Sequence, residues 1–224
     1  MNSIESLVAA ISAISLPGVF NPYAERCEEC DAEDAVEIRR ENLKTALKAA
    51  VQLKVRTVWI ARDLGYRGGR RTGLALTDEA HLLDHSSILG GVELRKSTQG
   101  PVISERTSSI IWRMAKRIDE PLFMWNVFPL HPHEAGKPFS NRCHTSSERA
   151  AMSWVLEEVL SILQPDKLFA IGRDAQSCLA SAGYSSVALR HPSYGGQNEF
   201  IRQVESEYRL TSTRGDDKSQ LSLI

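Results

Sequence analysis

The sequence lacks long hydrophobic runs and an excess of either charge, and we expect no secretory leader. No apolar stretch approaches the roughly 18 residues that a transmembrane helix needs, so we expect no membrane span. Lysine and arginine number 27 against 28 aspartate and glutamate residues, so a nucleic-acid-binding surface would need a local cluster of positive charge. The opening segment MNSIESLVAAISAIS has an acid but no base ahead of its apolar positions. We therefore expect a cytoplasmic protein.

Cysteine is also scarce, with four residues in a chain of 224. In the cytoplasm these side chains are expected to remain thiols. Cys27 and Cys30 form a Cys-x-x-Cys pair, which is half of a zinc or iron–sulfur site. Cys143 and Cys178 are not closely paired and do not complete such a motif. Ordinary thiols are the favoured interpretation, and no bound metal is expected.

Hydrophobic periodicity predicts an alternation of helices and strands. Short runs of β-branched and aromatic residues indicate buried strands over 55–61, 122–128, 167–171 and 186–190. Helical spacing predicts helices over 4–14, 31–53, 107–118, 145–163, 173–182 and 197–208, and a capping-box pattern from Thr145 to Glu148 begins the fourth of them. This order predicts the α/β class: a three-layer α/β/α sandwich with a central parallel four-stranded sheet. We expect a single domain over residues 1–210 and a flexible polar tail over 211–224.

The unusual residues of the chain lie in the loops that follow the predicted strands. Residues 62–73 form a glycine-rich and arginine-rich loop after the first strand, and Asn126 lies near the end of the second. The fourth strand is followed by His191 and the segment PSYGG. Since the carboxyl ends of parallel strands gather at one edge, where ligands bind, we expect the functional site there.

Several of these segments resemble the uracil-DNA glycosylase superfamily. GYRGGRRTG, WNVFPLHPH and RHPSYGG occur in the same order as the motifs of a bacterial branch of that family, and NPY, IRRENL and AIGRDA fit the same pattern. The resemblance covers most of residues 20–205. It implies a monofunctional DNA glycosylase of base excision repair, which flips uracil out of DNA and hydrolyses its N-glycosidic bond to leave an abasic site.

The resemblance implies two catalytic residues. Asp63 falls where the family places a water-positioning Asp, and His191 matches the histidine that donates a hydrogen bond to the uracil carbonyl as charge builds on the leaving base. Many members of the branch carry Glu where this chain has Arg62, so the identity of the water-activating group stays open. The alternatives are an aspartate that caps a turn and a histidine satisfied by loop backbone groups.

The base pocket implied by the family is only partly matched. Asn126 corresponds to the base-reading amide, which accepts from uracil N3–H and donates to O4; a strand residue that bonds only its neighbours is the alternative. Leu76 stands where the family commonly stacks an aromatic ring, a role that Tyr66 or Phe128 would have to fill. Gly65 stands where the best-known branch uses Tyr to exclude the thymine methyl group, so rejection of thymine is not guaranteed.

The same loops hold the candidate DNA contacts. Arg67, Arg70 and Arg71 are predicted to clamp phosphates, with a solvated surface loop as the alternative. Tyr194 is predicted to wedge into the base stack as the nucleotide is extruded. Further candidate contacts are Arg190, Ser193 and Gly195.

No cofactor is expected. Relatives that carry an iron–sulfur cluster have two further cysteines, at places where this chain has Leu130 and Met152. The expected partner is DNA containing uracil, bound by a monomer. Two alternatives stay open: a protein that binds uracil or abasic DNA without turnover, and an enzyme that acts on another deaminated base or a free nucleoside.

Overall fold

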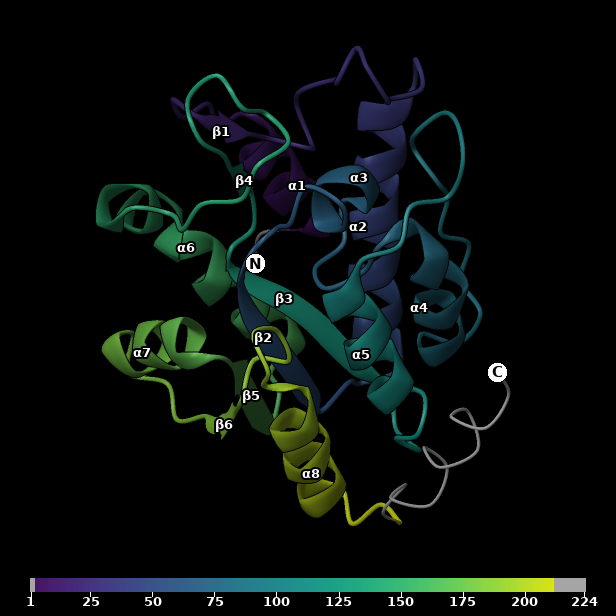
Figure 1. Ribbon diagram of the computed structural model, residues 1–224, viewed down its shortest axis with the longest axis vertical. Coiled ribbons are helices and arrows are strands. Elements are labelled where there is room, and N and C mark those ends of the chain that lie inside the picture. The colour runs from purple at the N-terminus through teal and green to yellow at the C-terminus, as the bar shows by residue number, and fades with distance from the viewer. Residues whose placement is uncertain (1–2, 212–224) are drawn as a thin grey trace, which may run out of the picture.

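The computed structural model describes residues 3–211, so all but the first residue of the predicted tail lies outside the described residues. At its centre is a parallel sheet in the order β3-β2-β5-β6 (Figure 1). Strand β2 (Thr57–Asp63) pairs with β3 (Leu122–Phe128) on one side and β5 (Lys167–Ile171) on the other. Strand β6 (Val187–Leu189) pairs with β5 at the edge. The predicted parallel four-stranded sheet is therefore confirmed.

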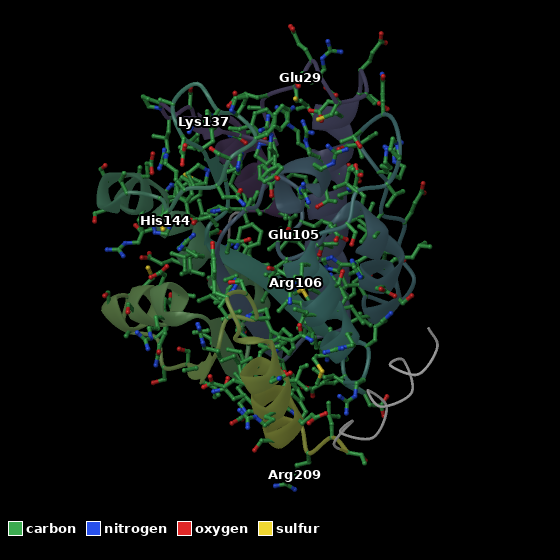
Figure 2. All side chains as sticks on the ribbon, viewed as in Figure 1. Glu29, Glu105, Arg106, Lys137, His144 and Arg209 are labelled. Carbon is green, nitrogen blue, oxygen red and sulfur yellow. The ribbon has the colours of Figure 1, made fainter. Side chains whose placement is uncertain are left out.

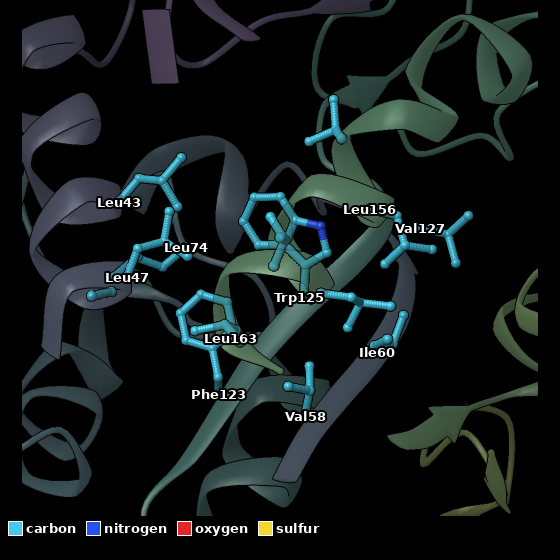
Figure 3. Close-up of a cluster of buried hydrophobic side chains, with 14 of the residues drawn as sticks. Leu43, Leu47, Val58, Ile60, Leu74, Phe123, Trp125, Val127, Leu156 and Leu163 are labelled. Carbon is cyan, nitrogen blue, oxygen red and sulfur yellow. The ribbon is translucent and has the colours of Figure 1, made fainter. Parts of the chain in front are cut away.

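One face of the sheet is covered by four helices. They are α1 (Ile4–Ser12), α2 (Ala35–Gln52), α6 (Ser146–Leu163) and α7 (Arg173–Ser181). Alternate side chains of β2 and β3 point into this layer, among them Val58, Ile60, Phe123 and Trp125, and they meet leucines of α2 and α6 (Figure 3). Burial of this apolar surface provides most of the free energy that holds the helices on the sheet.

The opposite face is covered by α5 (Arg106–Ala115) and α8 (Gln197–Glu207). Trp59 of β2 lies in this second core, where its ring contacts Phe169 and Phe200 edge-on and its Nε1 donates to the Tyr208 hydroxyl over 2.9 Å. Helices on both faces make the three predicted layers.

Five short elements were not predicted. Strands β1 (Val19–Phe20) and β4 (His131–Pro132) form a small antiparallel pair, and residues 69–88 contain α3 (Gly69–Thr72), a 3₁₀ turn (Glu79–His81) and α4 (Leu82–Ile88). Elements of two to seven residues are too short to show a helical or strand period. Within residues 3–211, none of the helices has the length and apolar character needed to cross a membrane.

The capping box at the start of α6 is confirmed and fixes the segment before that helix. Thr145 Oγ1 accepts from the Glu148 N–H over 3.2 Å, and Glu148 Oε2 accepts from the Thr145 N–H over 2.7 Å. Arg142 donates to both oxygens of Glu148 over 2.8 and 2.6 Å, and this contact lowers the pKa of Glu148 to about 2. Residues 142–145 are thereby held beside the end of β2.

Candidate functional site

Asp63 is the last residue of β2, and its carboxylate is held from two sides. His144 Nδ1 hydrogen-bonds Asp63 Oδ1, and Arg62 Nε donates to Oδ2 over 2.5 Å. Arg62 also donates from Nη1 to Asp174 Oδ2 over 2.6 Å. The Asp63 side chain is only 6% exposed. Asp63 therefore lies at the predicted edge of the sheet, but each of its oxygens already has a protein partner.

Asn126 lies beside Asp63 on the neighbouring strand. Its Nδ2 donates to the Asp63 carbonyl oxygen over 3.1 Å, and the residue is buried. Its Oδ1 is also buried and has no hydrogen-bond partner in the part of the chain that the structure describes. Because an unpaired buried acceptor costs about 1–3 kcal/mol, this oxygen suits an N–H donor that a ligand would bring.

His191 follows β6 and is held as a neutral donor. The Ser193 N–H donates to His191 Nδ1 over 3.2 Å, and Ser193 Oγ lies 2.7 Å from the same nitrogen. A ring nitrogen that accepts from a backbone N–H carries no proton, so the neutral ring is protonated at Nε2. Burial, together with the charges of Arg62 and Arg190, lowers the pKa of His191 to about 4. At neutral pH the imidazole therefore offers one N–H from Nε2.

The three residues predicted from distant stretches of the chain come together at one edge of the sheet. Asn126 bonds the backbone of Asp63, and the cation of Arg62 acts on both Asp63 and His191. Gly172, with φ of +90°, allows the turn after β5 to approach the histidine closely, since an added Cβ would lie 3.2 Å from His191 Cβ. An acid, an amide and an imidazole thus lie around one edge, although their catalytic roles remain predictions.

The three candidate stacking residues differ in exposure. Phe128 is fully buried and packs against the His144 ring at a centroid distance of 5.3 Å. Leu76 is half-buried with φ of +55°, and its carbonyl oxygen accepts from Trp112 Nε1 over 3.1 Å. Tyr66 is also half-buried. The structure therefore favours Tyr66 or Leu76 over Phe128 as the surface open to a base.

A carboxylate that sequence reasoning missed lies against the glycine loop. A Cβ added to Gly65 would lie 3.3 Å from Glu105 Oε2, and one added to Gly68 only 2.5 Å away. Burial raises the pKa of Glu105, the charge of Asp78 raises it further, and Arg67 opposes the shift. The carboxylate faces a cavity of about 360 Å³ lined by Tyr66, Arg67, Glu105, Arg106, Thr107 and Asn141. No motif marked this residue, because only the fold brings the start of α5 to the glycines.

The expected three-arginine phosphate clamp needs correction. Arg67 is exposed, with its guanidinium carbon 5.5 Å from the Tyr66 ring centroid. Arg70 is only 3% exposed and hydrogen-bonds the Pro138 carbonyl. Arg71 is turned toward the buried Glu79 carboxylate, 3.2 Å away. The helical turn α3 directs these two side chains inward, so only Arg67 remains a candidate phosphate contact.

The loop after β6 presents the other candidate DNA contacts. Tyr194 is 99% exposed with φ of +49°, and Gly195 follows with φ of +78°. Arg190 is exposed, with its Nε 4.0 Å from the Glu199 carboxylate. Ser193 is committed to His191 through its hydroxyl and its N–H. The exposure of Tyr194 suits the predicted wedge. The polar groups of Ser193, in contrast, orient the His191 ring.

His144 is the second residue that sequence reasoning missed. It stands just before α6, and Figure 2 labels it and Glu105 on either side of the region where β2 and β3 end. Its side chain is 7% exposed. The residue lies in an irregular segment between two recognised motifs, so neither periodicity nor motif spacing singled it out.

The cysteines do not fit a four-thiolate cluster. Cys27 is buried and Cys30 half-buried, and both are free thiols. Burial, with a contribution from Cys27, raises the pKa of the Cys30 thiol to about 12. Leu130 and Met152, at the places of the other two ligands, are hydrocarbon and thioether side chains fully buried in the core. Among residues 3–211 there is also no group of three or more His, Cys, Asp or Glu side chains that would hold a metal ion.

Comparison with known proteins agrees with the predicted resemblance. A solved structure of wild-type SMUG2 from Pedobacter heparinus matches with a TM-score of 0.62 and 16% identity, over 92% of this chain and 97% of that chain. At this identity the match concerns the fold. A search of curated proteins gives no match. The sequence profile of the Uracil DNA glycosylase superfamily matches residues 51–208, which span all four strands of the parallel sheet and the site at its edge. The chain therefore belongs to the uracil DNA glycosylase superfamily.

Proposed function

We propose that this protein is a monofunctional DNA glycosylase that releases uracil from DNA and leaves an abasic site. Membership of the superfamily supports a DNA glycosylase. The observation that carries the choice of uracil is the buried and unpaired Oδ1 of Asn126. Uracil N3–H is a donor that would satisfy this oxygen, whereas cytosine presents an acceptor at the same position. A site built to pair with a donor rejects an analogue that lacks it by as much as ~10⁴-fold.

The neutral His191 suits the departing base. As the glycosidic bond breaks, the electron pair moves onto the base, and the Nε2–H of His191 would donate to the uracil carbonyl that carries the negative charge. The carboxylate of Asp63 would stabilise the positive charge on the sugar. Arg67, Arg190 and the backbone at Gly195 would hold the DNA phosphates, with Tyr194 replacing the flipped nucleotide in the stack.

Base release from single-stranded and duplex oligonucleotides tests this function. We expect uracil to be released, and His191→Ala and Asn126→Ala each to lower the single-turnover rate by about 10²–10³-fold, the effect typical of a lost transition-state hydrogen bond. His133→Ala is the matched control, because within the described part of the chain the only hydrogen bond of the His133 ring is to the adjacent Glu134 carbonyl, 3.1 Å away. Release of thymine, hypoxanthine or xanthine in preference to uracil would contradict the proposed substrate, and binding of uracil-containing DNA without release would contradict the proposed catalysis.

A further inference from the structure

The partners of Asp63 raise the question of which group activates water. One carboxylate oxygen bonds His144 Nδ1 and the other accepts from Arg62, which is itself tied to Asp174. A carboxylate held in this way on both sides has little freedom to bind and deprotonate a water molecule. It is well placed, however, to orient the imidazole that it contacts.

The hydrogen bond assigns the tautomer of His144. A carboxylate can only accept, so the ring nitrogen that contacts Asp63, Nδ1, carries the proton. The neutral imidazole then has its lone pair on Nε2, on the far side of the ring from the carboxylate. In residues 3–211 no protein group hydrogen-bonds this Nε2, and it is not among the fully buried atoms without a partner. This nitrogen is therefore not fully buried and has a free lone pair that can accept a proton from water.

The ring of His144 is also fixed in place. Phe128 packs against it, and the side chain is only 7% exposed. The next residue, Thr145, is the N-cap of α6, whose capping box is closed by Glu148 and anchored by Arg142. A general base works only if it is held within reach of the proton that it removes before the reaction begins. Phe128 and the capped start of α6 hold the His144 ring in this way.

We propose that Asp63 and His144 form a catalytic dyad in which His144 Nε2 is the general base that activates the hydrolytic water and Asp63 is the residue that positions it. The proposal rests on the proposed glycosylase function. The water oxygen forms a bond to sugar C1′ while its proton passes to His144 Nε2. The bond from C1′ to the base nitrogen breaks, and its electron pair leaves with the base as an anion. Transfer of the proton from His144 to the base or to solvent then restores the enzyme.

The charges around the dyad are compatible with this role. Arg62 pairs with the second oxygen of Asp63 over 2.5 Å. The charged and titratable groups that face the pair from neighbouring elements are Arg62, Arg142, Cys143, Glu148 and Asp174. None of these groups hydrogen-bonds His144 Nε2, so this nitrogen is left to accept the proton.

Single-turnover release of uracil by the full-length protein tests the dyad. We expect His144→Ala and His144→Gln each to lower the rate by about 10²-fold or more, because neither alanine nor glutamine can accept the proton. DNA affinity should change little. A rate that depends on a general base falls as the pH is lowered, and this fall should be absent from both variants. A His144→Gln enzyme with the wild-type rate would overturn the proposal, since glutamine can still bond Asp63 but cannot act as a base. His133→Ala again serves as the control.

A second measurement judges the dyad without relying on uracil release. The ¹⁵N resonances of the His144 imidazole should show the Nδ1–H tautomer at neutral pH, and Asp63→Asn should abolish that preference. An Nε2–H tautomer in the wild type would overturn the proposal whatever base is released. If the wild type shows the Nδ1–H tautomer but releases no uracil, hypoxanthine or xanthine, the proposed function fails, and with it the base role of His144, while the pairing with Asp63 stands.

Discussion

At the scale of single residues, Arg67 and Arg70 make a matched pair with opposite expected effects. The Arg70 guanidinium carbon lies 4.1 Å from the Phe20 ring centroid and 4.9 Å from that of Phe139, in a buried setting. We expect Arg70→Ala to lower the free energy of unfolding by roughly 2–4 kcal/mol, since it removes a desolvated cation–π contact and leaves a cavity. Arg67→Ala should change that free energy by less than about 0.5 kcal/mol but weaken DNA binding and reduce its salt dependence.

Urea denaturation and DNA binding at several salt concentrations measure the two effects. An Arg70→Ala protein with unchanged stability and weakened DNA binding would show that Arg70 faces DNA after all. Sequence alone could not separate these arginines, because they lie three positions apart in one basic segment and only the short turn α3 decides which side chain points inward. Asp63, Asn126 and His191 could be placed together because each lies at or near the carboxyl end of a strand with a clear hydrophobic run.

At the scale of an element, the N-terminus of α6 connects stability with catalysis. Thr145→Ala should lower the free energy of unfolding by about 1 kcal/mol, the usual cost of a lost N-cap. Because His144 is the residue before this cap, the same change should also slow uracil release by several-fold. Ser3→Ala is the matched control: Ser3 caps α1 by accepting from the Ser6 N–H over 3.1 Å, far from the site along the chain. Equal release rates for the two variants would show that the cap does not position His144.

The long elements followed from the sequence, and the short ones did not. Strands β3 and β5 have the predicted bounds, and α6 begins after its predicted capping box, because hydrophobic runs and capping residues are local signals. The sequence predicts a loop over 62–73 and no element over 74–106, yet this segment contains α3 and α4. These short helices depend on tertiary contacts such as the Asn42 side chain donating to the Thr72 and Arg95 carbonyls. The fold of this segment brings Glu105 against the glycine loop, so the contact could not be predicted from the sequence.

At the scale of the whole molecule, alternating strands and helices predicted the layers but not the order of the strands. The order β3-β2-β5-β6 places β2 in the middle, so Asp63 neighbours Asn126 directly while His191 lies two strands away. What links the histidine to the acid is Arg62, whose charge acts on both. Arg62 departs from the family pattern, so the family motifs alone could not have predicted this link.

Buried histidines should make the whole fold sensitive to acid. Burial lowers the pKa of His85 to about 3 and those of His131 and His191 to about 4, against about 6.5 for an unfolded histidine. Between pH 6.5 and 4 the unfolded chain therefore binds more protons than the folded one, and stability must fall as the pH is lowered. We expect the thermal midpoint to drop across this window, and further below pH 4.5 as Glu148 loses its charge.

Thermal unfolding in buffers from pH 8 to pH 4 measures this dependence. His85 is fully buried, and its Nδ1 hydrogen-bonds Thr77 Oγ1 over 2.9 Å. Because His85→Leu removes this titrating group, the variant should lose less stability per pH unit than the wild type, whatever its stability at pH 8. Equal slopes for His85→Leu and the wild type would mean that the acid sensitivity comes from groups other than His85, with the paired carboxylate of Glu148 as the next to test.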